Sequence, residues 1–273
     1  MSYDLDEGTV RRLVAKGLAD HPARAGRFLA LAVGPGTPLA DVARTVERQI
    51  FGDDAGTMAA GLRRYEDDSL FFVVLDRRTG LPAGAARVID GGGRTLDVAP
   101  DRIGLPLPAI VAVYAMHTGR IWDFATVAVL PAYRGGGWSA LTVSSLLYRA
   151  FLNAGRLAGV RHLVTMLDRR AHRNLMLLGV RFEPMAGSAP LAEPAIEPFY
   201  APFAELEPAI ARQSDRLRTT GSDFAGEIHT RGLRRLLTRR TAARVAGQVA
   251  SGAGLDEHIV LPAMDRRKRI RQR

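Results

Sequence analysis

The residues best suited to chemistry lie between a predicted strand and a predicted helix. Arg134 is followed by Gly135, Gly136 and Gly137, and then by Trp138 and Ser139. Glycines let a backbone turn with positive φ and let a ligand approach closely. The first N–H groups of a helix have no intrahelical partner and lie at the positive end of its dipole. This stretch therefore predicts an anion site suited to a pyrophosphate.

The elements on either side of the glycines would position this site. Ile121 to Leu130 is rich in apolar and β-branched residues and predicts a buried strand, which Pro131 ends because proline cannot donate to a sheet. After the glycines, apolar residues recur at helical spacing. These are Leu141, Val143, Leu146, Leu147 and Phe151.

Three other glycine-loop motifs fit less well. A P-loop requires Gly-Lys-Ser/Thr, and this loop has no lysine. The G-x-G-x-x-G spacing of a dinucleotide-binding turn is also missing. Gly137-Trp138-Ser139 begins like a nucleophile elbow but lacks the closing glycine, so Ser139 is a poor candidate for a hydrolase nucleophile. A plain glycine-rich turn is the remaining alternative.

The stretch from Val127 to Leu141 resembles motif A of the GNAT acyltransferase superfamily, Arg/Gln-x-x-Gly-x-Gly/Ala. Arg134, Gly137 and Ser139 fall on the motif positions, and Ser139 departs from the pattern but is small enough for the loop to close. The resemblance implies that the loop amides bind the pyrophosphate of coenzyme A. Acetyl-CoA or a longer acyl-CoA would then be the donor, with an acyl carrier protein as the alternative.

A second stretch is similar to the GNAT end motif, Asn-x-x-Ala-x-x-x-Tyr-x-x-Leu-Gly-Phe. Ala171, Leu178 and Gly179 match it, Asp168 stands at the asparagine position, and Leu175 stands at the tyrosine position. Asp168 is thereby included in the predicted cofactor site. In many acetyltransferases the tyrosine protonates the leaving thiolate, and leucine cannot donate a proton. The sequence therefore argues against ordinary tyrosine-assisted amine acetylation.

The same resemblance suggests catalytic groups. It implies that a backbone N–H on the motif strand, near Ala128 or Val129, faces the thioester carbonyl, and that a carboxylate acts as general base. Asp123 is the first candidate because it lies on this strand. Glu66 and Asp68 are second, because they stand just before the strand predicted from Ser69 to Asp76.

Asp123 lies between Trp122 and Phe124. Desolvation by such neighbours would raise the pKa of its carboxyl group toward neutral pH, which suits a base. The alternative is a carboxylate that merely caps or ion-pairs the end of the strand.

Other features are similar to the acyl-homoserine-lactone autoinducer synthases and N-acyl amino acid synthases, a GNAT-fold branch with long-chain donors. They are the helices predicted at the N-terminus and the proline-rich stretch from Met185 to Phe203. The resemblance extends from about Val42 to Phe203.

The remaining pattern predicts helices and strands in mixed order. Helices are expected at Glu7 to Leu18, Arg24 to Val33, Pro38 to Phe51 and Pro108 to Gly119, and after Asp168. Strands are expected at Ser69 to Asp76 and Leu81 to Asp90, as a hairpin, and at Val160 to Leu167 and Val180 to Met185. We therefore expect an α/β GNAT fold, with a mixed central sheet flanked by helices.

The composition points to a soluble, cytoplasmic protein without a signal peptide or membrane span. Of the 273 residues none is cysteine, and the histidines show no metal-ligand spacing, so no metal site is expected. Residues 231–273 hold 12 basic and 3 acidic residues, whereas the other 230 hold 26 and 25. The C-terminal segment is therefore cationic and the body nearly neutral.

The chain is expected to form an acyltransferase domain, residues 1–205, and a basic helical extension, residues 206–273. Within the extension, Leu233, Leu236, Leu237, Val245 and Val249 predict an amphipathic helix, and Arg266 to Arg273 form a basic tail. The tail could be a solvated terminus, or it could dock an acidic acyl carrier protein, nucleic acid or an anionic membrane surface. Nucleic acid is the less favoured partner, since no aromatic residues are interleaved.

The predicted reaction is transfer of an acyl group from a CoA or carrier-protein thioester to a small amine or amino acid. The alternative is a catalytically silent GNAT-fold module that binds nucleic acid or a protein partner through its basic segment.

Overall fold

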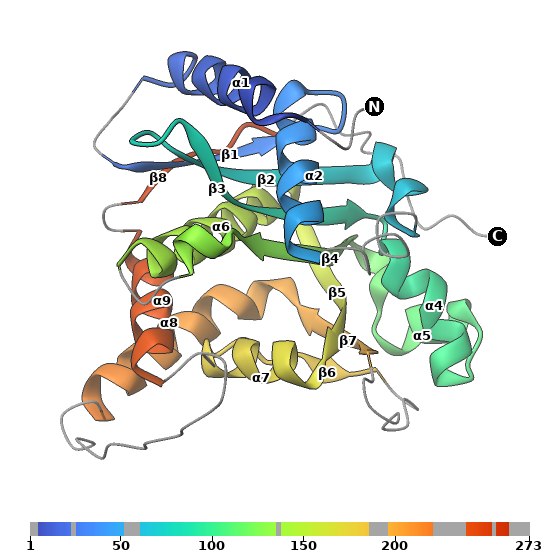
Figure 1. Ribbon diagram of the computed structural model, residues 1–273. Coiled ribbons are helices and arrows are strands. Elements are labelled where there is room, and N and C mark those ends of the chain that lie inside the picture. The colour runs from blue at the N-terminus through green and yellow to red at the C-terminus, as the bar shows by residue number, and fades with distance from the viewer. Residues whose placement is uncertain are drawn as a thin grey trace.

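The computed structural model describes residues 5–22, 26–51, 61–134, 138–185, 196–220, 239–252 and 255–261. Within these ranges, a single mixed sheet of eight strands runs through the molecule in the order β6-β7-β5-β4-β3-β2-β1-β8 (Figure 1). The strands are β1 (Phe28–Val33), β2 (Ser69–Asp76), β3 (Leu81–Asp90), β4 (Arg120–Val129), β5 (Val160–Asp168), β6 (Glu183–Pro184), β7 (Ile196–Pro202) and β8 (Asp256–His258).

Helices cover both faces of the sheet. They are α1 (Glu7–Ala19), α2 (Pro38–Phe51), α4 (Gly93–Ile103), α5 (Leu107–Val113), α6 (Trp138–Ala158), α7 (Arg169–Leu177), α8 (Phe203–Thr220) and α9 (Arg239–Ser251). Short 3-10 turns are η1 (Glu66–Asp68), η2 (Met116–Thr118) and η3 (Pro131–Tyr133).

The two faces have separate cores. We call one face the α2–α4 face. There, α1 and α2 cover β1 to β4, and α4 packs against β4, β5 and β7. On the other, the α6 face, α6, α8 and α9 enclose the largest cluster of buried side chains, which includes Phe72, Trp122, Phe124 and Phe151. The predicted α/β architecture is confirmed.

Most of the helices and strands predicted in the central part of the chain are present. The hairpin of β2 and β3, the motif strand β4, the following helix α6, the parallel strand β5 and helix α7 all form where the sequence placed them. Pro38 begins α2 as expected.

The helix predicted from Arg24 to Val33 was wrong, because residues 28–33 form β1, which pairs antiparallel with β2. Its apolar side chains alternate between the two cores, since Phe28 and Ala30 face α6 whereas Leu29 and Leu31 face α2. A short apolar run that is buried on both faces lacks the polar alternation of a half-exposed strand.

Two other predictions need correction. The helix expected from Pro108 to Gly119 is split into α5 and η2, and the strand expected from Val180 to Met185 is reduced to the two residues of β6. The proline-rich stretch from Met185 to Phe203 contains β7, which lies between β5 and β6. β7 carries Pro198 and Pro202, and its partner β6 is very short, so few ladder bonds are lost.

The described part of the predicted C-terminal extension belongs to the body of the molecule. Val245, Ala246 and Val249 of α9 lie in the core of the α6 face, and β8 pairs in parallel with β1. Leu233, Leu236, Leu237 and the tail from Arg266 to Arg273 lie outside the described residues. The boundary between residues 205 and 206 stays a prediction.

Candidate active site

Strands β4 and β5 part in the middle of the sheet. Their pairing ends at Asp123 and Val164, although β4 continues to Val129 and β5 to Asp168. The Thr165 hydroxyl still donates to the Phe124 carbonyl oxygen at 2.8 Å. The register between β3 and β4 also shifts at this point, leaving Ala125 without an opposite residue. Beyond Phe124, therefore, the edge of β4 that faces β5 makes no ladder hydrogen bonds with that strand.

The direction of the backbone groups follows from the ladder on the other edge. The Leu130 N–H donates to the Ala83 carbonyl of β3 at 3.0 Å. Because successive residues of a strand point their N–H groups to opposite edges, those of Ala128 and Thr126 also point toward β3. Val127 and Val129 then direct theirs toward the open edge. Of the two residues predicted to face a thioester, Val129 has the suitable direction and Ala128 does not.

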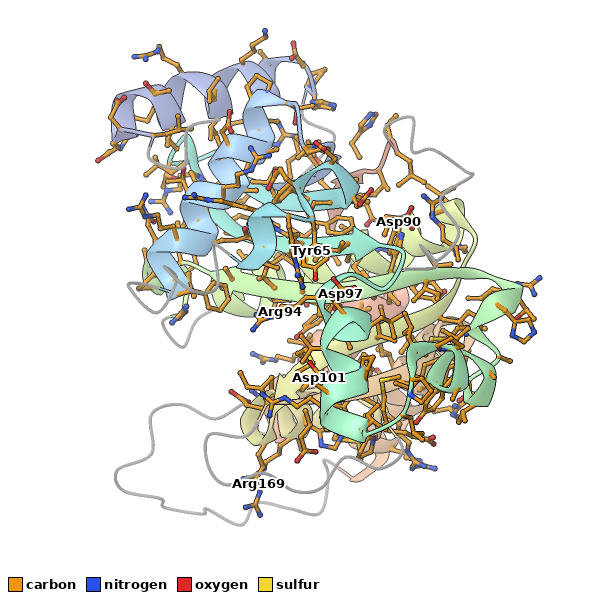
Figure 2. All side chains as sticks on the ribbon, turned by 90° about the vertical axis from the view of Figure 1, so that its right-hand side faces the viewer. Tyr65, Asp90, Arg94, Asp97, Asp101 and Arg169 are labelled. Carbon is orange, nitrogen blue, oxygen red and sulfur yellow. The ribbon has the colours of Figure 1, made fainter. Side chains whose placement is uncertain are left out.

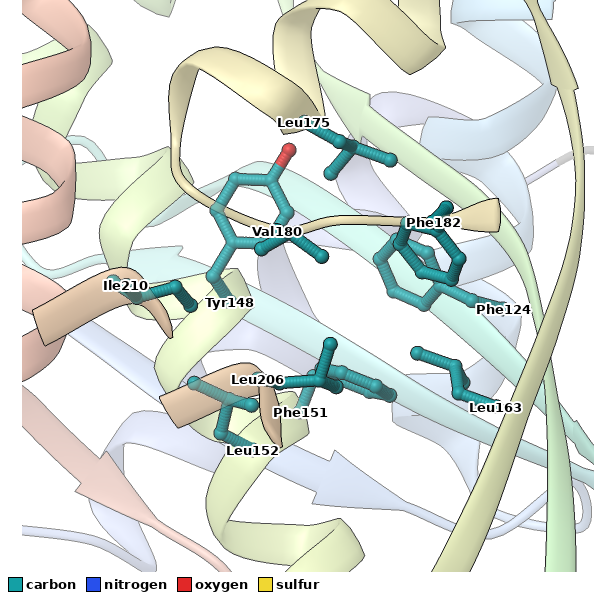
Figure 3. Close-up of a pocket in the computed structure, with 10 residues that line it drawn as sticks. All are labelled: Phe124, Tyr148, Phe151, Leu152, Leu163, Leu175, Val180, Phe182, Leu206 and Ile210. Atoms are coloured by element: carbon teal, nitrogen blue, oxygen red, sulfur yellow. The ribbon is translucent and has the colours of Figure 1, made fainter. Parts of the chain in front are cut away.

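A pocket opens beside this edge on the α6 face (Figure 3). Its walls come from β4, β5, α6, α7, the chain after α7, and α8. The lining residues are Phe124, Tyr148, Phe151, Leu152, Leu163, Leu175, Val180, Phe182, Leu206 and Ile210. Its free volume is about 20 Å³, which is close to the space that one water molecule needs. An apolar group longer than a methyl would enter only if side chains of α8 or α6 moved.

Leu175 forms part of this wall and is 6% exposed. It contributes packing where the resemblance would place a tyrosine hydroxyl. The Tyr148 ring lies beside it, and burial raises the pKa of Tyr148 to about 12. That phenol is therefore neutral over the whole physiological range.

The residues around the glycine loop are held by a hydrogen-bond network. The Tyr133 hydroxyl donates to the buried Asp76 carboxylate at 3.0 Å, and Arg27 donates to the same carboxylate. The Arg134 side chain folds back so that its Nε donates to the Val129 carbonyl at 2.6 Å. This bond places the exposed Arg134 next to the open edge of β4.

The other predicted loop residues are only partly visible. Gly135, Gly136 and Gly137 lie outside the described residues, and Trp138 and Ser139 are the first two residues of α6. Asp168 is the N-cap of α7, and its Oδ1 accepts from the Ala171 N–H at 2.6 Å. As an exposed cap at the end of β5, Asp168 lies across the opening from the end of β4.

Asp123 is enclosed on the α2–α4 face. It is 1% exposed, and its two carboxylate oxygens accept from the N–H and the hydroxyl of Thr95, each at 2.8 Å. Burial raises the pKa of Asp123 to about 7, although the Thr95 bonds favour the charged form. Gly93, with φ +43°, starts α4 so close that a Cβ there would lie 2.9 Å from Asp123 Oδ2. Asp123 therefore pins α4 to β4.

Glu66 lies in a buried network of charges on the same face. Its carboxylate accepts from Arg44 and more weakly from Arg87, at 3.5 Å, while Arg87 donates to Glu47 at 2.6 Å. Glu47 also accepts a hydrogen bond from Thr126, on the part of β4 beyond the register shift. The network thus joins α2, η1, β3 and β4. Asp68, the last residue of η1, is partly exposed.

Sequence reasoning missed Arg44, Glu47, Arg87 and Thr126. Arg87 stands within a run of small apolar residues in β3, and Glu47 lies among the buried positions of α2. A charge inside an apolar strand is itself a signal, because burial of an unpaired charge is costly. The structure brings Glu66 to this network, and it leaves Asp123 in a separate contact with α4.

No protein-family model matches the sequence, and no curated protein matches it. Among solved structures, FeeM, an N-acyl amino acid synthase from uncultured soil microbes, superposes with a TM-score of 0.50 at 13% identity. The match covers 70% of this chain and 98% of FeeM. The chain has the GNAT fold. At this identity the likeness is one of fold.

Two further solved structures match with lower TM-scores. The CoA-dependent acyl-homoserine lactone synthase BjaI, with SAM and isopentyl-CoA, has a TM-score of 0.45 at 15% identity and covers 81% of this chain and 99% of its own. A putative N-acetyltransferase from Lactobacillus plantarum has a TM-score of 0.42 at 16% identity, with 64% and 99% covered.

The described residues also lack two other kinds of site or segment. No group of three or more His, Asp or Glu side chains could hold a metal ion there. No helix in the same ranges has the length and apolar character needed to cross a membrane.

Proposed function

We propose that this protein is an acyltransferase that moves an acyl group from a CoA thioester to a small amine or amino acid. The observation that carries the proposal is the coincidence of an open β4 edge and an entirely apolar pocket where β4 and β5 part. A thioester needs both, because its carbonyl oxygen requires N–H donors and its acyl group requires an apolar wall. The GNAT fold supports the same reaction.

The donor would lie along the gap between the two strands. Arg134 and the N-terminus of α6 would hold its phosphates, since both present positive charge there. The N–H groups of Val127 and Val129 are suited to hydrogen-bond the carbonyl oxygen as it becomes negative. Phe124, Leu163 and Phe151 would surround the acyl group.

The acceptor amine would approach from the α2–α4 face, opposite the pocket. Its nitrogen forms a bond to the carbonyl carbon, the carbon–sulfur bond breaks, and the amine proton passes to a base. Asp123 stays the first proposed base because a pKa near 7 suits proton transfer at neutral pH, and Glu66 and Asp68 stay second. Leu175 gives the thiolate no proton, so the thiolate would leave as the anion and be protonated by solvent.

The experiment is an acyl transfer assay on the purified full-length protein with acetyl-, octanoyl- and dodecanoyl-CoA and a mixture of amino acids and amines. We expect release of free CoA thiol that depends on the acceptor, and an N-acyl product detectable by mass spectrometry. Thiol release that is independent of any acceptor, or no release, would contradict the proposal.

The alternative is a catalytically silent module that binds nucleic acid or a protein partner. Two observations favour it: Leu175 in place of a tyrosine, and the surplus of basic residues after residue 230. Binding of nucleic acid or of an acidic protein in the absence of CoA-thiol release would support this alternative.

A further inference from the structure

Arg94 occupies a distinctive place in the first turn of α4. It precedes Thr95, whose N–H and hydroxyl both bind Asp123, and Asp123 belongs to the last pair between β4 and β5. Figure 2 shows Arg94, Asp97 and Asp101 along α4, with Tyr65 above them in that view. Arg94 therefore lies beside the point where the two strands part, on the α2–α4 face.

Arg94 is partly buried, yet within the part of the chain that the structure describes no side chain or carbonyl pairs with its guanidinium. Three other arginines do form ion pairs. Arg87 pairs with Glu47, Arg120 pairs with Asp90 at 2.7 Å, and Arg64 pairs with Asp97 at 3.1 Å. A partly desolvated guanidinium whose hydrogen bonds are not made by the protein favours an anionic ligand that can accept them.

The electrostatic surroundings agree with this placement. Burial is the main influence on the pKa of Asp123, and the positive charge of Arg94 is among the weaker influences that lower it. The guanidinium is thus within electrostatic range of the last β4–β5 pair. No hydrogen bond joins the guanidinium to Asp123, whose two oxygens accept from Thr95.

The two faces of β4 divide the reacting groups. Phe124 faces the apolar pocket, and its neighbour Asp123 faces α4, as expected for successive residues of a strand. An acyl group held by Phe124 would occupy the α6 face. The α2–α4 face would then stay open to the acceptor. An acceptor whose amine meets the thioester there would have Arg94 beside its remaining groups.

We propose that Arg94 binds the carboxylate of an α-amino acid acceptor, so that the protein acylates amino acids in preference to simple amines. This inference rests on the proposed acyl transfer. A guanidinium binds a carboxylate through two parallel hydrogen bonds, which fixes orientation as well as position. Those bonds would aim the α-amino group at the thioester carbonyl. The phosphates of the donor are the other anions available, and they belong at the opposite strand end, near Arg134.

Calorimetric binding of a product-like pair tests the inference without requiring turnover. The ligands are N-octanoylglycine and its primary amide, which differ only in the carboxylate. We expect the wild type to bind the acid at least about 10-fold more tightly than the amide, as for a charge-assisted hydrogen bond. Arg94→Gln should abolish this preference, and Arg94→Lys should retain part of it because the charge remains.

Arg102→Gln is the matched control, since Arg102 is an exposed arginine at the other end of the same helix. It should bind both ligands as the wild type does. Equal affinity of the wild type for acid and amide, no binding of either, or an equal loss for both ligands in Arg94→Gln would overturn the inference.

The acyl transfer assay separates this inference from the proposed reaction. A wild type that prefers the acid yet transfers no acyl group would keep the carboxylate site and contradict the reaction. An Arg94→Gln protein that acylates amino acids with unchanged KM would keep the reaction and contradict the carboxylate site.

Discussion

At the scale of single residues, Asp123 combines two demands that usually exclude each other. A carboxylate that pins a helix through two hydrogen bonds gains from being charged, whereas complete burial favours the neutral acid. Burial dominates, because the pKa of Asp123 rises to about 7 despite both Thr95 bonds. The same carboxylate can therefore serve as a structural contact and as a group that changes charge near neutral pH.

The stability of the protein should depend on the charge of Asp123. Because its folded pKa of about 7 lies above its ordinary value of 3.8, this contribution is fully present below about pH 4 and is lost as the pH rises through 7. The loss amounts to at most about 4 kcal/mol. Urea unfolding at pH 5, 6, 7 and 8 should show Asp123→Asn gaining stability relative to the wild type as pH rises. Parallel pH profiles for the two proteins would refute the raised pKa.

Turnover tests the second role of the same residue. If Asp123 accepts the amine proton, Asp123→Asn should reduce kcat by about 100-fold or more, because general base catalysis typically contributes that much. Donor binding should change little. Steady-state kinetics with acyl-CoA give both values, and Asp68→Asn provides the comparison. Unchanged turnover in Asp123→Asn would move the role of base to Glu66 or Asp68 and leave Asp123 with the helix contact alone.

The buried charges beside Phe71 hold α2 and η1 on the sheet. Arg87 and Arg44 each lie over the Phe71 ring, 4.4 and 4.9 Å from its centre, and both are 2% exposed. Replacing one member of such a network leaves carboxylates buried without their partner.

Arg87→Met should therefore lower the free energy of unfolding by about 3–5 kcal/mol, as for a buried ion pair that loses one partner. Arg11→Gln is the control, because Arg11 pairs with Glu7 on an exposed helix surface, and it should cost less than about 1 kcal/mol. Urea unfolding of both variants measures the difference. A similar small effect in both would mean that the network contributes packing rather than charge pairing.

At the scale of elements, the sequence predicted the helices and strands whose formation is signalled by residues close together in the chain. The hairpin of β2 and β3 and the strand–glycine–helix order from β4 to α6 have local signals. Helix α4 has weak ones, since it begins at Gly93 and contains Pro100. It forms because Thr95 binds Asp123 and because Leu96 and Ala99 are buried against the sheet. Such tertiary contacts override propensity and are not visible in a window of sequence.

The site residues stay predictions, and the geometry bears on only some of them. The motif predicted strand β4 and helix α6, which form, and it named Ala128 and Val129 as residues that face the donor. The choice between Ala128 and Val129 depends on which edge of β4 pairs with β3, and this is a property of the register. Arg94 was not among the predicted residues, because its proposed role depends on the docking of α4 beside the last β4–β5 pair.

A glycine in β3 lets α6 approach the sheet. A Cβ on Gly84 would lie 2.8 Å from the Ala128 carbonyl oxygen and 2.9 Å from a Val143 methyl group. Gly84→Ala should therefore push α6 away from β3 and β4 and cost about 1–3 kcal/mol of stability. Because α6 begins directly after the glycine loop, CoA affinity should fall as well.

Calorimetric CoA titration and urea unfolding measure the two effects of Gly84→Ala. Gly36→Ala is the matched control, since nothing lies within 4 Å of a Cβ at that turn position. Unchanged CoA affinity in Gly84→Ala would separate the position of α6 from donor binding.

At the scale of the whole molecule, the last strand of the described chain pairs with the first. β8 pairs with β1, and Glu257 accepts from Arg149 of α6 at 2.7 Å, while Asp256 accepts from Arg77 at 2.9 Å. A three-residue strand has almost no sequence signal of its own. The sequence therefore suggested a separate extension. In the structure, the described part of that segment forms one edge of the sheet and packs into the core of the α6 face.

The charge distribution leads to the last prediction, which separates an acyl carrier protein from free acyl-CoA as donor. Residues 231–273 carry 12 basic and 3 acidic residues, and the rest of the chain is nearly neutral. Carrier proteins are strongly acidic, so this segment should speed their encounter through long-range attraction. Salt screens such attraction beyond about 10 Å at 0.1 M.

Deleting residues 266–273 removes six of the twelve basic residues of this segment. The truncated protein should react more slowly with an acyl carrier donor at low salt, and the difference should shrink as salt rises. Transfer from acyl-CoA should be unaffected, because its phosphates would bind near Arg134 at the start of α6. Transfer rates of both proteins with each donor, at low and high salt, provide the test. Equal losses of rate with the two donors would indicate a structural tail. No loss with either donor would contradict a role of the tail in carrier-protein binding.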